Sequence, residues 1–144
     1  MQLWGGTSDY LINMLQVLQN KAARFVTKLG IYTSQKTLLL QCGWLSVRQL
    51  IQYHSLIMIF KVKLERKPVF LQQHLSQRFN YRTRFASTGS VVFNQKNSCD
   101  ISKHSFLVRS TERWNSLPPH IKQAENLGAF KWKLRTWLKQ HVTQ

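Results

Sequence analysis

The chain has 144 residues, 43% of them hydrophobic, and its 21 Lys and Arg against 5 Asp and Glu give a formal net charge of +16. This length predicts a single domain, and the hydrophobic fraction excludes a disordered chain. The charge favours a polyanionic partner: nucleic acid, an anionic membrane or an acidic protein. The two cysteines are isolated, which argues against a disulfide scaffold. The longest apolar run, residues 56–60, is too short to span a membrane.

A first helix is predicted over residues 8–29. Its apolar side chains recur at steps of three and four, and this stripe is expected to be buried: Leu11, Leu15, Leu18, Ala22, Phe25 and Leu29. Gly30, which tolerates a left-handed conformation, is the expected end of the helix. Beside the stripe lie three cations that we predict to contact phosphate: Lys21, Arg24 and Lys28.

Two more helices are predicted in the N-terminal half. One covers residues 34–42 and ends at Gly43, and the next begins after Ser46, with Gln49 placed to complete a capping box. The latter helix is expected to end before Pro68. The side chains on its predicted buried face are Val47, Leu50, Ile51, His54, Ile57, Met58 and Leu64.

The pattern changes after this helix. Residues 69–75 are predicted to add one or two helical turns, whereas residues 77–104 lack a helical period and are expected to be irregular or to form a β-hairpin with a strand at 91–94. Here Arg82 and Arg84 alternate with Tyr and Phe side chains. On an extended chain both point to the same side, and their guanidinium groups suit phosphate. A solvated basic loop is the alternative.

The C-terminal part is predicted to be helical again. A helix-like sequence pattern returns over residues 105–116, is interrupted at the double proline 118–119, and resumes over residues 126–142. Because each proline fixes φ, the prolines make a stiff corner. Trp114 is expected to fill the core of that corner, and Arg113 is its expected external contact, one of the residues predicted to bind nucleic acid.

The final helix has the clearest two-sided pattern. The residues of its apolar face are Leu127, Phe130, Leu134, Trp137 and Leu138. Three flanking cations are spaced by four residues: Lys131, Arg135 and Lys139. Trp132 falls nearly opposite the apolar face, and an outward aromatic among cations suits stacking on a nucleobase while the cations meet phosphate. The alternative is that residues 77–110 cover Trp132.

These elements predict a mainly α protein: a small helical bundle with a basic irregular or β-hairpin segment inserted before the C-terminal helices. We divide it into a helical group (1–76), the basic segment (77–104) and a C-terminal helical segment (105–144) that packs on the first group, in one compact unit.

Signals for catalysis, metal binding or a cofactor are weak. The acidic residues are isolated, so none pair to hold Mg²⁺, and no glycine-rich phosphate loop is present. Cys99, Asp100 and His104 lack the partner motif of a nucleophilic site, and Cys99, His104 and His74 lack the spacing of zinc ligands. His54, on an apolar helix face, is interpreted as a core histidine. We expect no catalytic residue, metal or cofactor, and an intracellular location, nuclear or cytoplasmic.

Several stretches in order resemble the C-terminal end of the non-LTR (LINE-like) retrotransposon reverse transcriptases of animals. They are "LWGG", "LQVLQNKAARFVTKL", "LLQCGWLSVRQLIQY", "YRTRF" and "HSFLVRSTERWNSLPPHIKQAENLGAFKWKLRTWL". The resemblance covers nearly the whole chain and implies a thumb-like helical region and the part behind it, which in that family hold template and primer. The family's catalytic palm lies upstream, so the resemblance implies no polymerase activity for this chain alone.

The expected function is therefore binding of RNA and/or DNA through phosphate contacts, with the remainder of a reverse transcriptase as a further partner. One alternative is a structural or protein-interaction helical remnant without a specific ligand. Another is a membrane-surface binder that uses the basic last helix; we favour it least, because so small a domain needs the apolar face of that helix for its core.

Overall fold

The computed structural model describes residues 8–65 and 106–140 of the protein. In these two stretches the regular elements are all helices: α1 (Asp9–Thr27), α2 (Gln35–Cys42), α3 (Val47–Glu65), α6 (Phe106–Asn115), α7 (Pro119–Lys122) and α8 (Leu127–Gln140). The expectation of a mainly α protein is confirmed for them. The predicted helical turns at 69–75 and the basic segment 77–104 lie outside the described residues.

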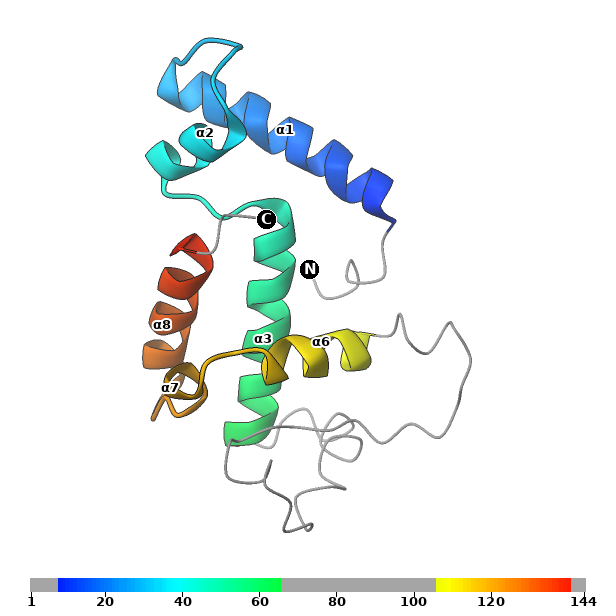
Figure 1. The fold of residues 1–144 in the computed structure, drawn as a ribbon, viewed down its shortest axis with the longest axis vertical. Helices are drawn as coiled ribbons and strands as arrows, with labels where there is room; N and C mark the ends of the chain where they lie inside the picture. Colours follow the sequence, from blue (N-terminus) through cyan, green and yellow to red (C-terminus); the bar gives the residue numbers. More distant parts are fainter. Residues whose placement is uncertain (1–7, 66–105, 141–144) are drawn as a thin grey trace.

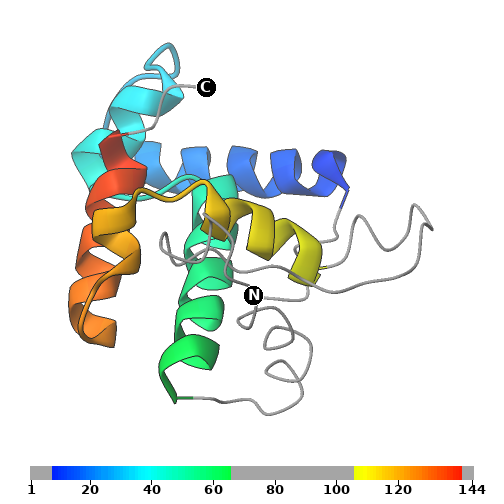
Figure 2. The same ribbon diagram turned by 60° about the horizontal axis from the view of Figure 1, so that its bottom comes forward.

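Helix α3 lies at the centre of the arrangement. α8 runs antiparallel beside it, α6 crosses it, and α1 lies across the end at which α3 begins, with α2 packed on α1 (Figure 1). In both views α6 and the first turns of α1 lie on one side of α3, and α8 lies on the other (Figure 2). Helices from both ends of the chain are therefore supported by α3.

The main core lies where α3, α6, α7 and α8 meet. Its buried members are Leu45, Leu56, Ile59, Phe60, Val62, Trp114, Leu117, Ile121, Phe130, Leu134 and Leu138. The rings of Phe60 and Phe130 stack with their centroids 4.1 Å apart, and Trp114 packs against Phe130 at 5.8 Å. Burying one phenylalanine contributes about 1.5–3 kcal/mol, so this cluster holds the two described stretches together.

The corner between α6 and α7 confirms the predicted role of Trp114, whose side chain is fully buried. Beside it, the Nζ atom of Lys122 donates a hydrogen bond of 3.0 Å to the backbone oxygen of Asn115, which holds α7 against the end of α6. Burial, and then the charge of Lys63, lower the pKa of Lys122. The Nζ atom of Lys63 lies 5.7 Å from the Trp114 ring centroid, within the range of a cation–π contact.

Both α2 and α3 begin at a side-chain cap. Ser34 Oγ accepts a hydrogen bond of 3.2 Å from the backbone N–H of Thr37, and Gly43 ends α2 in the left-handed conformation with a φ of 65°. Ser46 and Gln49 form the predicted capping box. The Ser46 N–H donates to Gln49 Oε1 at 3.0 Å, and the Gln49 N–H donates to Ser46 Oγ at 3.3 Å.

The predicted buried face of α3 is only partly right. Ile51 is buried, but Leu64 is 50% exposed and the other predicted members are half-buried. Leu56, Ile59 and Phe60 are buried more completely. The reason is that α3 is packed by α1, α6 and α8 on different sides, so it does not bury a single stripe.

The predicted orientation of α1 is wrong. The apolar stripe that includes Leu18 and Phe25 faces outward, and these two side chains are 59% and 87% exposed. The buried residues of α1 are Ile12 and Ala23, which lie about a third of a turn away round the helix. The helix also ends before the expected glycine, at Thr27, and Lys28 follows it with a φ of 55° as the left-handed cap.

Amide side chains explain the orientation of α1. Gln16 Oε1 accepts a hydrogen bond of 2.9 Å from the backbone N–H of Val47, and Gln19 Nε2 donates one of 2.8 Å to the backbone oxygen of Leu45. These bonds satisfy backbone groups at the start of α3, where the first N–H groups of a helix lack intrahelical partners. Since residues of α3, α6, α7 and α8 already fill the main core, the stripe of α1 has no helix to pack on among the described residues.

Candidate nucleic-acid interface

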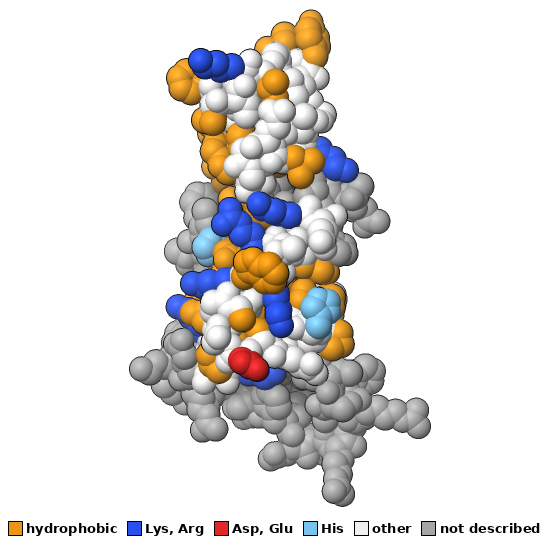
Figure 3. Space-filling view, turned by 90° about the vertical axis from the view of Figure 1, so that its left-hand side faces the viewer, with side chains coloured by type: hydrophobic (Ala, Val, Ile, Leu, Met, Phe, Trp, Pro, Cys, Tyr) orange, Lys and Arg blue, Asp and Glu red, His pale blue; other side chains and the backbone are white. Residues whose placement is uncertain are grey.

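The outer face of α8 carries the cations and the aromatic side chain predicted to meet nucleic acid. Trp132 is 70% exposed, Lys131 and Arg135 are exposed, and Lys139 is half-buried. Figure 3 views the side of the molecule formed by α2, α7 and α8, and shows Lys and Arg side chains gathered with hydrophobic side chains among them. We call the surface made by these four residues the α8 face.

The opposite side of α8 anchors this face rigidly. Its predicted apolar side is confirmed: Phe130, Leu134 and Leu138 are buried in the main core. The helix starts at a side-chain cap, because Asn126 Oδ1 accepts a hydrogen bond of 2.7 Å from the Ala129 N–H. A buried face that is fixed in this way determines which side chains point outward.

The loop after α2 extends the α8 face toward α3. The Nη2 atom of Arg135 lies 3.4 Å from the backbone oxygen of Gly43, a long hydrogen bond that brings the α8 cations to this loop. A hollow of about 280 Å³ adjoins it. The residues around the hollow are Gln19, Trp44, Leu45, Leu50, Tyr53 and Arg135. Two aromatic rings and a guanidinium group beside one another suit the stacking of an unpaired base.

The predicted basic edge of α1 is a separate strip. Lys21 and Lys28 are exposed, whereas Arg24 is half-buried, and its Nε atom is buried without a hydrogen-bond partner among the described residues. Helix α1 packs on α2 and α3 rather than on α8. The basic edge of α1 is therefore not part of the α8 face. A nucleic-acid strand would have to cross the α2–α3 loop to contact both surfaces.

Arg113 is not the outward contact that the sequence predicts. Its side chain is half-buried and lines a cleft between α1, α2, α3 and α6. Burial, followed by the like charge of Arg109, lowers the pKa of Arg113. The other predicted phosphate contacts, Arg82 and Arg84, lie outside the described residues.

The same cleft contains basic residues that sequence reasoning missed: Lys36, Arg48 and Arg109. They come from three different helices and are far apart in the chain, so no sequence spacing relates them. The only signal was local. Arg109 and Arg113 are four residues apart, which places two cations on one face of a helix.

His54 has a less buried position than the one predicted. It is half-buried at the edge of the core, with its ring edge-on to Tyr53 at a centroid distance of 5.4 Å. Desolvation by burial is the main cause that lowers the pKa of His54, and the nearby charge of Lys131 acts in the same direction. Both effects favour the neutral form of the His54 imidazole.

No metal site or membrane span is apparent in the parts of the chain that the structure describes. No three His, Cys, Asp or Glu side chains gather there in a way that could hold an ion. None of the helices in residues 8–65 and 106–140 combines the length and the apolar character needed to cross a bilayer.

Comparison with known proteins adds no relative. No family model, no curated protein and no solved structure matches the chain.

Proposed function

We propose that this protein binds RNA or DNA strands with little sequence preference, through the α8 face. The observation that carries the proposal is the 70% exposed ring of Trp132 on the same side of α8 as Lys131 and Arg135. Exposing so large an aromatic ring to water is unfavourable, and a nucleobase stacked on it would remove that cost. The neighbouring cations would meet the phosphates on either side of the base.

The origin that we propose for the chain is the thumb and following region of a retrotransposon reverse transcriptase. The support is the order of the motifs in the sequence, together with a helical arrangement that exposes basic residues on α8. In this proposal the chain holds template and primer, Arg82 and Arg84 contribute further phosphate contacts, and catalysis belongs to a palm on a larger protein.

A protein-interaction role is the second candidate, and one observation favours it. Helix α1 exposes an apolar stripe that includes Leu18 and Phe25, and exposed apolar patches of this kind often mark contacts with other proteins. In that case the positive charge serves solubility, and the α8 face has no specific ligand.

Substitution of Trp132 tests the proposed function. Trp132→Ala should weaken binding of a labelled single-stranded RNA by about 1–3 kcal/mol, measured by fluorescence polarisation, because one base loses its stacking partner. Trp132→Phe keeps a ring and should restore most of the affinity. The matched control is Tyr32→Ala, since Tyr32 is 96% exposed but lies between α1 and α2, and it should bind as the unaltered protein does. Equal affinities for all four proteins would contradict the proposal.

The salt dependence of binding separates the two candidates. For single-stranded RNA, the slope of log affinity against log salt should be about −0.7 per phosphate contacted. Arg135→Gln removes one phosphate contact, so it should reduce the magnitude of the slope by about 0.7. A solubility surface predicts instead that heparin and RNA compete equally and that strand length has no effect. That result would favour the protein-interaction role.

A further inference from the structure

A cleft of about 710 Å³ lies between α1, α2, α3 and α6, away from the α8 face. Its volume is within the range of small-molecule sites. Of its described lining residues, Lys36, Arg48, Arg109 and Arg113 are cationic and only Asp9 is acidic, which leaves an excess of three positive charges. A concave surface lined by one sign of charge concentrates the electric field, so it attracts small anions.

The arginines of α6 are the most concentrated part of this charge. Arg109 and Arg113 are one helical turn apart and face the same cleft. Burial, and then repulsion from Arg109, lower the pKa of Arg113, and the neighbouring Glu112 opposes this only in part. A bound anion would offset both the repulsion and the lost hydration.

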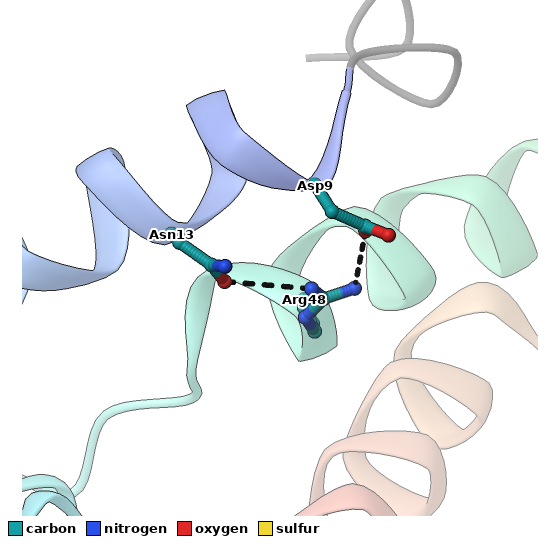
Figure 4. A network of polar contacts seen from close by, with 3 residues as sticks. All are labelled: Asp9, Asn13 and Arg48. Carbon is teal, nitrogen blue, oxygen red and sulfur yellow. Dashed lines mark hydrogen bonds and ion pairs between the residues drawn. The ribbon is translucent and has the colours of Figure 1, made fainter.

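Arg48, on α3, lines the same cleft. Its Nη1 atom is 2.9 Å from Asp9 Oδ1, and its Nη2 atom is 3.4 Å from Asn13 Oδ1 (Figure 4). The side chains of Arg48 and Asp9 are 57% and 79% exposed. An ion pair so open to water contributes about 0–1 kcal/mol, so a phosphate can compete for this guanidinium group at little cost.

We propose that this cleft binds the phosphate monoester of a nucleotide, with Arg48, Arg109 and Arg113 as the phosphate ligands. A guanidinium group can donate two parallel hydrogen bonds to two oxygens of one phosphate, which favours phosphate over an anion that accepts only one. A terminal phosphate carries a charge of about −1.5 to −2 at pH 7, whereas a diester carries about −1, and the excess positive charge of the described lining residues favours the former. The amides of Gln35 and Gln52 also line the cleft and can meet the sugar or base.

This site goes beyond the proposed function and uses none of the residues of the α8 face. The same phosphate chemistry has two sources: a free nucleotide and the 5′-phosphorylated end of a strand. In both cases the monoester, rather than the strand between its ends, is the group that the cleft recognises.

Calorimetric titration of the whole chain with adenosine 5′-monophosphate, and with adenosine, tests the proposal. The monophosphate should bind and adenosine should bind at least about tenfold more weakly, because charge-assisted hydrogen bonds supply the affinity. Arg109→Gln together with Arg113→Gln should reduce the affinity by about tenfold or more. Lys133→Gln, a neutralised cation on α8 outside the cleft, is the matched control and should change it less than about twofold.

Three further arms make the result decisive. Arg48→Gln, at an exposed position, should also weaken binding, so the proposal does not depend on α6 variants that fail to fold. Trp132→Ala should leave monophosphate affinity unchanged even if it abolishes strand binding, which separates this site from the α8 face.

Oligonucleotides with and without a 5′ phosphate then identify the source of the phosphate: a preference for the phosphorylated strand indicates the strand end, and no preference indicates the free nucleotide. Equal binding of adenosine and its monophosphate, or monophosphate binding unaffected by Arg48→Gln and by the α6 substitutions, would overturn the proposal.

Discussion

The two halves of the described fold are held together by different interactions. Around α8, the contacts with α3 and α6 are aromatic and aliphatic: Phe60 and Phe130 stack, and the Trp114 ring packs at a tilt against both. Around α1, the contacts with the start of α3 are largely hydrogen bonds from Gln16 and Gln19. The comparison teaches that an amphipathic helix does not always bury its apolar stripe. Which side it buries depends on which apolar surfaces and unpaired backbone groups of the neighbouring helices remain available to it.

The difference also separates the two candidate sites. The α8 face is fixed by the main core, so its cations and Trp132 have a rigid support. The cleft instead lies between α6, which belongs to the core, and the α1–α2 pair, which is attached through polar contacts. Movement of that pair relative to α6 would change the shape of the cleft without disturbing the α8 face.

The largest effect is expected from truncating the aromatic core. Phe130→Ala should lower the free energy of unfolding by about 3–5 kcal/mol, because it removes a fully buried ring from the stack and leaves a cavity. Urea denaturation followed by circular dichroism measures this. Phe25→Ala, at the 87% exposed position on α1, is the matched control and should change the stability by less than about 0.5 kcal/mol. A large loss from Phe25→Ala would mean that the stripe of α1 is covered in solution.

An intermediate and local effect is expected at α1. Gln16→Ala removes the acceptor for the Val47 N–H and should cost about 1–3 kcal/mol where that group stays shielded from water. Native-state hydrogen exchange should show faster exchange of the α1 and α2 amides, while the amides of α8 keep their protection. Uniformly faster exchange across both regions would contradict the separation between the polar and the apolar half.

The smallest effect concerns pH. Because burial lowers the pKa of His54 below its ordinary value of 6.5, the unfolded chain binds a proton more readily than the folded one as the pH falls through that value. Stability from this group is therefore fully present above about pH 6.5 and decreases below it. Thermal unfolding from pH 7.5 to 5 should show this decrease, and His54→Gln should reduce it. If the two proteins have the same pH profile, the decrease comes from other groups.

Several local features were predictable because they depend on a few adjacent residues. Gly43, and Ser46 with Gln49, mark helix ends through backbone preferences and hydrogen bonds that act within four residues. The prediction of which side of α8 is buried was also correct, since its apolar residues pack into the main core. The outward position of Trp132 followed directly from that side.

The sequence alone therefore determined roughly where the described helices other than α7 lie, how two of them are capped, and which side of α8 carries cations around Trp132. Only the tertiary structure decided that α1 turns its apolar stripe outward, that α3 is packed on several sides, and that Arg48, Arg109 and Arg113 meet in one cleft. The physical reason is range. Caps and helical periodicity are interactions between near neighbours, whereas burial and the gathering of charges depend on how distant segments share a limited apolar surface.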